Sequence, residues 1–242
     1  MKVVAIIPAA GLGTRMASAR GARGKKPAAT KQFTELGGTP ILIRTLRKFV
    51  ASPEVCEIYI ALRGNEIEGF RARLEKETKD ILQKTIHLVE GGEHRQHSVA
   101  NALNSVSAAD EDIVLVHDAV RSFVTEEIIH DVIQTAQKYG AAIAGLPAVD
   151  TVKQVERTSD GALITATLPR ERVVLAQTPQ GFRYDVLKKA FDEAMADGFV
   201  GTDEASLVER SGHAVAVVMG SPKNIKITAP GDMELAEFFL KR

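Results

Sequence analysis

The chain has 242 residues, 45% of them hydrophobic, so it can bury a substantial core, and we expect one domain over residues 1–242. Its 31 basic and 31 acidic residues cancel, which disfavours nucleic acid or an anionic membrane as partner, and no apolar run is long enough to span a membrane. Cys56 is the only cysteine and lies in an apolar run, so we expect a buried thiol in a protein of the reducing cytoplasm.

Strand-like and helical patterns alternate through the first 146 residues, which is typical of parallel βαβ units. The run "KVVAII" predicts the first strand, and Pro40 opens a helix with one apolar face. Further strands are expected at "EIYIAL", "TIHLVE", "DIVLVH" and "AAIAGL", and helices near 65–82, 95–107 and 126–139. Thr125 is a good N-cap and Gly140 a good C-cap for the last of these helices.

The pattern changes between Pro147 and Thr178. Short strand-like pieces, "DTVKQVE", "ALITATL" and "VVLAQT", are separated by turn residues and predict an antiparallel β-ribbon arm over 147–178. Helices are then expected near 184–197 and 203–211, strands at "HAVAVVMG" and "NIKIT", and a final helix from about Gly231. The predicted fold class is α/β, with a Rossmann-like, mixed but mostly parallel sheet and a protruding β-ribbon arm.

A glycine turn, "PAAGLGTRM", follows the first strand inside a cationic segment that has no acidic residue before Glu35. Met16 stands where a dinucleotide-binding loop has its third glycine, and no acidic residue ends the second strand. A Walker A loop is also excluded, because Gly24-Lys25 is followed by Lys26 rather than Ser or Thr. The turn can still bring backbone N–H groups and an arginine close to phosphates, which suits a nucleoside triphosphate.

Two polar segments follow predicted strands. Asp118 ends an apolar strand, where open α/β sheets place ligand-binding residues, although an aspartate there is also commonly a turn or cap residue. In "GGEHRQHSV", His94 and His97 have the spacing of one helix face and raise the question of a zinc site. No third or fourth ligand is apparent in the sequence, and polar residues are expected where a helix begins.

Eight motifs occur in a familiar order: "PAAGLGTRM", "KQF", "GGEHRQHSV", "VHDAVRSF", "DTVKQV", "LAQTPQGF", "TDEASLVE" and "NIKIT". In these motifs the chain resembles, nearly end to end, the 2-C-methyl-D-erythritol 4-phosphate cytidylyltransferases of the non-mevalonate isoprenoid pathway. The resemblance implies a sheet of the nucleotidyltransferase type and a magnesium-dependent reaction. In that reaction the phosphate of the sugar alcohol attacks the α-phosphorus of CTP and releases pyrophosphate. It also implies a homodimer in which each arm reaches the neighbouring active site.

The resemblance assigns roles residue by residue. Arg15 and Lys31 stabilise the transition state and the departing pyrophosphate, and Asp118 binds Mg²⁺. The residues expected to contact CTP are Pro8, Ala9, Ala10, Gly11, Gly13, Gly92, Glu93, Ser98 and Ala119. Those expected to contact the polyol phosphate are Arg121, Thr151, Arg170, Thr178, Thr202 and Lys226, while Asp150 and Asp203 hold these elements or bind polyol hydroxyls. Without the resemblance, Lys226 would be an ordinary side chain of a strand in which apolar and polar residues alternate. Arg170 would be an ordinary charged residue of the β-ribbon.

Two alternatives remain open at this stage. A cytidylyltransferase for another polyol phosphate, such as ribitol 5-phosphate, needs the same CTP half-site and differs only in the polyol pocket. A nucleotide-binding regulatory module without turnover belongs to a different class. The presence of both Arg15 and Lys31 argues against that module, because binding alone does not need cations aimed at a leaving group.

Overall fold

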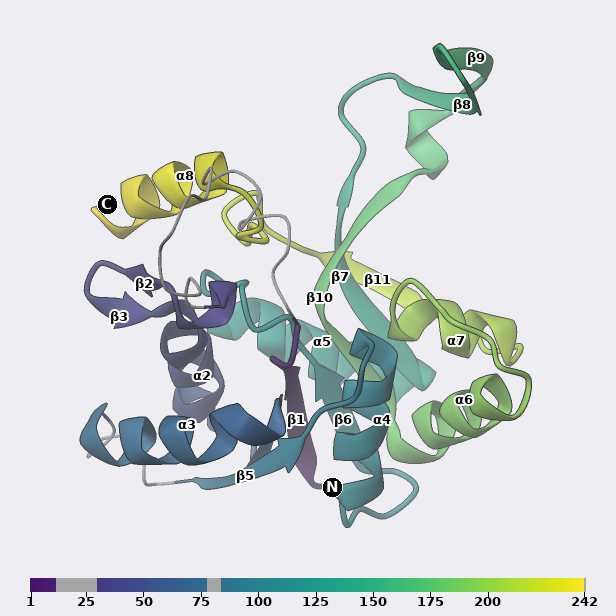
Figure 1. The fold of residues 1–242 in the computed structure, drawn as a ribbon. Helices are drawn as coiled ribbons and strands as arrows, with labels where there is room; N and C mark the ends of the chain where they lie inside the picture. Colours follow the sequence, from purple (N-terminus) through teal and green to yellow (C-terminus); the bar gives the residue numbers. More distant parts are fainter. Residues whose placement is uncertain (12–29, 78–83, 242) are drawn as a thin grey trace.

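The computed structural model describes residues 1–11, 30–77 and 84–241 (Figure 1). A seven-stranded sheet runs through its centre in the order β11-β7-β10-β6-β1-β4-β5. All neighbouring strands pair in parallel except β10, which lies antiparallel between β6 and β7. The strands are β1 (Val3–Pro8), β4 (Glu57–Leu62), β5 (Thr85–Glu90), β6 (Ile113–Val116), β7 (Ala141–Pro147), β10 (Val174–Arg183) and β11 (Ala216–Met219).

Helices cover both faces of this sheet, which explains why its central strands read as nearly continuous apolar runs. Alternate residues of β1 enter different cores: Val3, Ala5 and Ile7 on one face, Val4 and Ile6 on the other. The first core includes residues of α2 (Ile41–Ala51), α3 (Gly64–Glu77) and α5 (Glu126–Tyr139). The second includes residues of α4 (Arg95–Ser105), α6 (Tyr184–Ala196) and α7 (Glu204–Arg210).

A third, smaller core holds together segments that are far apart in the sequence. Leu36 of the β2–β3 hairpin (Glu35–Leu36 and Thr39–Pro40) packs with Val120, Ile227 and Ala236. Ala236 belongs to α8 (Pro230–Leu240), which lies beside β2 in Figure 1. The short helix η1 (Lys31–Phe33) precedes the hairpin, so this core positions the segments that carry Lys31 and Lys226.

An arm extends from the body of the protein (Figure 1). Its tip is an antiparallel hairpin of β8 (Val152–Thr158) and β9 (Gly161–Leu168), followed by the short helix η2 (Arg170–Arg172). A mostly parallel α/β sheet with a protruding β-hairpin is therefore confirmed. The third predicted ribbon piece, "VVLAQT", instead begins β10, which pairs first with the end of β7 and then continues into the main sheet.

Local signals were correct in several places and wrong in two. The side chain of Thr125 accepts a hydrogen bond from the N–H of Ile128, and Gly140 ends α5 with φ of 86°, so both caps are confirmed. The segment "NIKIT" forms no strand, because Asn224 and Ile227 are buried by packing as a loop. Cys56 is exposed rather than buried, because it precedes the first residue of β4. None of the helices in the described ranges has the length and apolar character that crossing a membrane requires.

Candidate functional site

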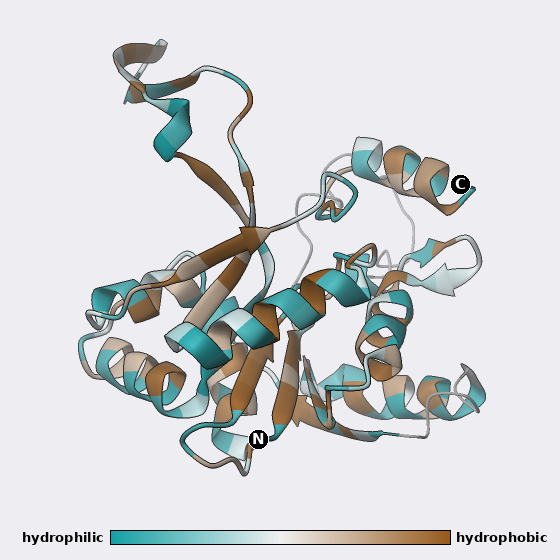
Figure 2. Cartoon of the chain, turned by 180° about the vertical axis from the view of Figure 1, so that it is seen from behind, coloured by the Kyte–Doolittle hydropathy of each residue, from teal (hydrophilic) through white to brown (hydrophobic). Residues whose placement is uncertain are grey.

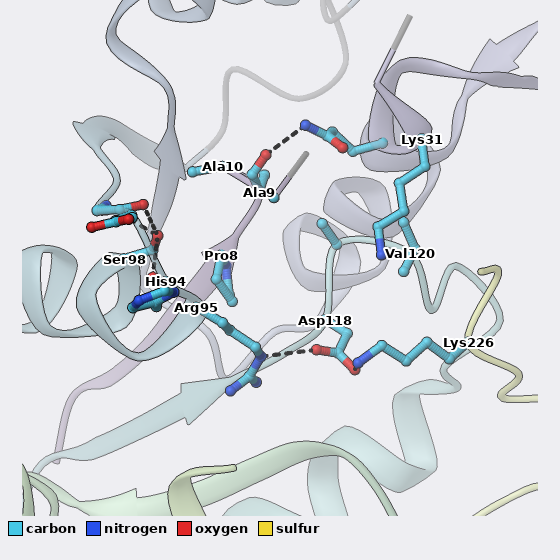
Figure 3. Close-up of a pocket in the computed structure, with 15 residues that line it drawn as sticks. Pro8, Ala9, Ala10, Lys31, His94, Arg95, Ser98, Asp118, Val120 and Lys226 are labelled. Carbon is cyan, nitrogen blue, oxygen red and sulfur yellow. Dashed lines mark hydrogen bonds and ion pairs between the residues drawn. The ribbon is translucent and has the colours of Figure 1, made fainter. Parts of the chain in front are cut away.

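A cavity of about 230 Å³ opens where the parallel strands β1 and β6 end (Figure 3). The carboxyl edge of an α/β sheet is the usual place for a ligand site. The cavity wall comes from the turn after β1, η1, the start of α4, the loop after β6 and the segment before α8. Its lining residues are Pro8, Ala9, Ala10, Gly11, Lys31, Gln32, Gly92, Glu93, His94, Arg95, Ser98, Asp118, Ala119, Val120 and Lys226.

The glycine turn forms one wall of the cavity. The amide of Ala9 donates to the carbonyl of Ala61 at 2.7 Å, which continues the sheet beyond β1. The buried Gln32 side chain donates to the carbonyl of Ala9 at 2.7 Å and ties the turn to η1. Lys31, the residue before it, points into the cavity (Figure 3). Gly13 and Arg15 lie outside the described residues.

The segment "GGEHRQHS" forms the opposite wall and depends on glycine. The amide of Gly91 donates to the carbonyl of Leu62 at 2.6 Å. A Cβ atom on Gly92 would lie 2.3 Å from the Cβ of His97, so no side chain fits there. The Ser98 hydroxyl oxygen accepts from the Gly92 amide at 3.1 Å, which folds the segment over the start of α4. Gly92, Glu93 and Ser98 therefore line the same cavity.

Positively charged side chains surround the carboxylate of Asp118. Its side chain is 8% exposed and is contacted by three cations. Arg95 Nε lies 3.2 Å from one carboxylate oxygen, while Lys226 Nζ at 2.8 Å and Arg121 Nε at 3.4 Å approach the other. Arg95 and Lys226 come from opposite sides of the carboxylate (Figure 3). Burial raises the pKa of Asp118, but these cations outweigh it and lower the pKa well below its usual value, so the carboxylate stays ionised.

Two residues of this network were missed in the sequence. Arg95 Nη1 donates to both carboxylate oxygens of Glu204, at 2.6 and 2.9 Å, and Glu204 is 1% exposed. Burial raises the pKa of Glu204, yet both of its oxygens accept from the Arg95 guanidinium, which favours the ionised form. The pKa of Arg95 is raised, because attraction to the two carboxylates outweighs the opposing effect of its burial. Both residues occur in quoted motifs, but only their proximity in space shows the pairing.

His117 and Thr178 fix the backbone around Asp118. The Asp118 amide donates to Thr178 Oγ1 at 3.0 Å, and Thr178 Oγ1 lies 3.1 Å from His117 Nδ1. His117 Nε2 lies 3.0 Å from the carbonyl of Arg121, which can only accept. The imidazole therefore donates from Nε2 and accepts the Thr178 hydroxyl proton at Nδ1. Burial lowers the pKa of His117 to about 4, so the ring is neutral at pH 7.

A second cavity, of about 190 Å³, adjoins the first. The two cavities share Arg95, Asp118 and Lys226. Thr202 and Asp203 belong to its wall, and Asp203 is held by a 2.8 Å hydrogen bond from the Gln180 side chain. The residues that line this second cavity are Arg95, Asp118, Arg121, Ala176, Gln177, Thr178, Gln180, Thr202, Asp203 and Lys226.

Thr151 and Arg170 are not on the wall of either cavity of their own chain. Both are exposed, and Arg170 donates to the carbonyl of Val149 at 2.9 Å within the arm. Asp150 is likewise exposed in the arm. Four of the six residues predicted for the polyol phosphate, Arg121, Thr178, Thr202 and Lys226, therefore come together in one chain, and the two arm residues do not.

Comparisons with known proteins find a matching family and named relatives. The model of the family described as "IspD: 2-C-methyl-D-erythritol 4-phosphate cytidylyltransferase" matches residues 3–242. Proteins named 2-C-methyl-D-erythritol 4-phosphate cytidylyltransferase are similar over the whole chain. That of Acidobacterium capsulatum is 56% identical over 242 residues, covering 100% of this chain and 98% of its own, and that of Solibacter usitatus is 54% identical over 241 residues, covering 100% and 96%.

Solved structures give the same result. The crystal structure of the 4-diphosphocytidyl-2C-methyl-D-erythritol synthase from Anaerococcus prevotii is 29% identical, with a TM-score of 0.81, and the match covers 100% of this chain and 96% of that one. The crystal structure of the Francisella tularensis 2-C-methyl-D-erythritol 4-phosphate cytidylyltransferase is 36% identical, with a TM-score of 0.78, and the match covers 98% and 99%.

Proposed function

This chain belongs to the 2-C-methyl-D-erythritol 4-phosphate cytidylyltransferase family, and we propose from that premise that it transfers a cytidylyl group from CTP to 2-C-methyl-D-erythritol 4-phosphate. The products are 4-diphosphocytidyl-2-C-methyl-D-erythritol, an intermediate of isoprenoid precursor synthesis, and pyrophosphate. The observation that carries the proposal is the pair of adjoining cavities with a common cationic wall. A reaction that joins two phosphate-bearing substrates needs two such sites meeting at one point.

The first cavity is the proposed CTP site. Backbone groups of Pro8, Ala9, Ala10 and Gly11, with Gly13, surround the triphosphate, and Gly92, Glu93 and Ser98 recognise the cytosine. Ala119 contacts the ribose. Lys31, which points into this cavity, and Arg15 are assigned to the charge that develops on the α-phosphoryl group and the leaving pyrophosphate.

The second cavity is the proposed site of the polyol phosphate. Arg121, Lys226 and Thr202 offer donors to its phosphate, and Thr178 supports the site by fixing Asp118. A phosphate oxygen of this substrate attacks the α-phosphorus of CTP. The new P–O bond forms as the bond from the α-phosphorus to the bridging oxygen breaks, and that oxygen leaves with pyrophosphate. Positioning and charge neutralisation supply most of the catalysis in such transfers.

Nucleotidyltransferases generally use a divalent metal, and we propose Mg²⁺ at Asp118. Within the described residues no group of three or more His, Cys, Asp or Glu side chains could hold a metal. One ionised carboxylate beside a triphosphate cavity nevertheless fits Mg²⁺, which is commonly bound by one or two carboxylates together with substrate phosphates. When bound, the ion neutralises phosphate charge and orients the triphosphate.

A pyrophosphate-release assay tests the function. CTP and Mg²⁺ are incubated with 2-C-methyl-D-erythritol 4-phosphate, with ribitol 5-phosphate, or with no polyol. We expect release with the first substrate alone. Equal release with ribitol 5-phosphate would identify a broader polyol specificity, while tight CTP binding without release from any polyol in a wider panel would indicate a regulatory module.

We also propose a homodimer built by the arm, in a reducing compartment such as the cytoplasm, where a single cysteine is typical. Figure 2, coloured by hydropathy, shows apolar residues on the arm and at its base. Leu163 and Ile164 at the tip are 65% and 64% exposed, and Val217 and Met219 of the edge strand β11 are 50% and 65% exposed. Exposed apolar strands favour pairing with another chain, and a second copy would bring Thr151 and Arg170 to its neighbour's second cavity.

Mixing two inactive variants tests the dimer. Lys31→Ala and Arg170→Ala homodimers should each be nearly inactive, whereas half of the dimers formed on random reassociation are mixed and each has one intact site. Activity should therefore recover to roughly a quarter of wild type. Lys31→Ala mixed with Lys226→Ala is the control without recovery, because both residues line the same cavity of one chain. If subunit exchange is verified with tagged chains and the first mixture stays inactive, Arg170 does not act in the neighbouring site.

A further inference from the structure

Glu204 is a buried carboxylate to which the proposed mechanism gives no role. It is the first residue of α7, is 1% exposed, and contacts Arg95 with both oxygens. Replacing a buried ion pair with apolar side chains of similar size is often neutral or stabilising, so this pair is weak evidence for a purely structural role. Its position matters more, because Arg95 lines both cavities and also contacts Asp118.

The contacts of Arg95 are unequal. Its Nη1 lies 2.6 and 2.9 Å from the Glu204 oxygens, whereas its Nε lies 3.2 Å from Asp118. Two carboxylates, Asp118 and Glu204, face three cations, Arg95, Arg121 and Lys226, so the cluster carries a net charge of +1. Without the Glu204 charge the net would be +2, and among the described residues Asp118 would be the sole carboxylate partner for all three cations. Both changes oppose the binding of a further cation at Asp118.

We propose that Glu204 is a positioning residue that holds Arg95 and neutralises its charge, so that Asp118 can accept a divalent cation together with the CTP phosphates. The inference rests on the proposed function, since it concerns the same CTP and metal site. Glu204 lines neither cavity, and it acts only through Arg95. Replacing a residue that contacts a metal ligand, as Arg95 contacts Asp118, typically changes metal affinity or activity by about 10- to 100-fold. Glu204 lies one contact further from Asp118, so we expect its effect at the lower end of this range.

The test compares CTP binding with and without metal in wild type and Glu204→Gln. Calorimetry gives the dissociation constant of CTP in EDTA and in saturating Mg²⁺, and their ratio measures how strongly the ion supports nucleotide binding. Glutamine keeps the shape of the side chain and removes its charge, so this ratio should fall about tenfold or more. Glu209→Gln, on the exposed side of the same helix, should keep the wild-type ratio.

A double variant separates positioning from a structural defect. Arg95→Met/Glu204→Gln removes the cation as well as its carboxylate, so the ratio should return toward the wild-type value, although Arg95 lines the cavities and turnover should fall. If Glu204→Gln does not fold, judged by circular dichroism and thermal unfolding, the double variant is compared directly with wild type and should still bind CTP more tightly with Mg²⁺.

Three results would overturn the inference: an unchanged ratio in Glu204→Gln, the same reduced ratio in the double variant as in the single one, or no support by Mg²⁺ in the double variant when wild type shows it. A wild-type protein that binds no CTP even with Mg²⁺ present would instead contradict the proposed function. The two failures are therefore distinguishable.

Discussion

A single methyl group at Gly92 should disable the proposed CTP site. The Cβ of an alanine there would lie 2.3 Å from the Cβ of His97, whereas ordinary contacts begin at 3.4 Å. The backbone of residues 91–93 must therefore move by about 1 Å, and a misplacement of that size near a reacting centre can lower the rate about a hundredfold. We expect kcat/KM for CTP to fall by about that factor in Gly92→Ala.

Gly69→Ala is the matched control for this experiment. Gly69 is an exposed residue of α3, and an added Cβ meets nothing within 4 Å, so the substitution should stabilise the helix by about 0.5–1 kcal/mol and leave turnover unchanged. The assay is pyrophosphate release at varied CTP, with thermal unfolding to show that Gly92→Ala is folded. A folded Gly92→Ala protein that uses CTP as efficiently as wild type would refute the placement of the nucleotide against this segment.

Three further predictions concern single side chains. Lys31→Ala should lower kcat about a hundredfold with a smaller change in CTP affinity, because the charge of Lys31 acts mainly on the transition state. The control Lys48→Ala, at an exposed lysine, should change neither kcat nor CTP affinity. Near-normal turnover of Lys31→Ala would contradict the catalytic role of Lys31. Glu93→Gln should narrow the preference for CTP over UTP in competition assays, and an unchanged preference would assign cytosine recognition to backbone groups. Burial raises the pKa of Asp232, but hydrogen bonds from the amides of Thr228 and Ala229 outweigh this effect and lower the pKa below its usual value. The stabilisation of the fold by the ionised Asp232 is therefore present above the pKa that Asp232 has in the unfolded chain. It is lost as the pH falls through the lower pKa that Asp232 has in the folded protein. Asp232→Ala should therefore cost about 1 kcal/mol in urea unfolding at pH 7 and less at pH 3, with exposed Glu234→Ala as control, and an equal loss at both pH values would contradict this reasoning.

Sequence patterns predicted the parallel part of the sheet because its central strands are buried on both faces and bounded by helix signals. They did not predict the path of β10. Its second half contains Pro179 and Gly181, which locally suggest a turn, yet Gly181 pairs with Leu115 and Ala142 in the middle of the sheet. A Cβ on Gly181 would lie 2.7 Å from Val132, so glycine is needed there for helix α5 to pack closely.

Alternating apolar residues had predicted a strand at "NIKIT", but a loop can produce the same pattern. Asn224 donates to the carbonyl of Thr178 at 2.9 Å, and the amide of Ile227 donates to the carbonyl of Val120 at 3.1 Å. These contacts bury Asn224 and Ile227, three positions apart, against the site loops instead of against a neighbouring strand. The same anchoring leaves Lys226, between them in the sequence, directed at Asp118. Lys226 therefore lines both cavities, although the element that carries it was predicted wrongly.

Residues at strand ends could be assigned from the sequence because the carboxyl ends of parallel strands share one edge of a sheet. Arg95 could not be assigned in this way. A charged residue at the start of a helix is ordinarily solvated. The two carboxylates that pair with Arg95 lie 23 and 109 positions away, in the loop after β6 and at the start of α7. Its importance follows from geometry alone: one guanidinium contacts two carboxylates and lines both cavities, so a change in either carboxylate alters the charge that the two proposed substrates meet.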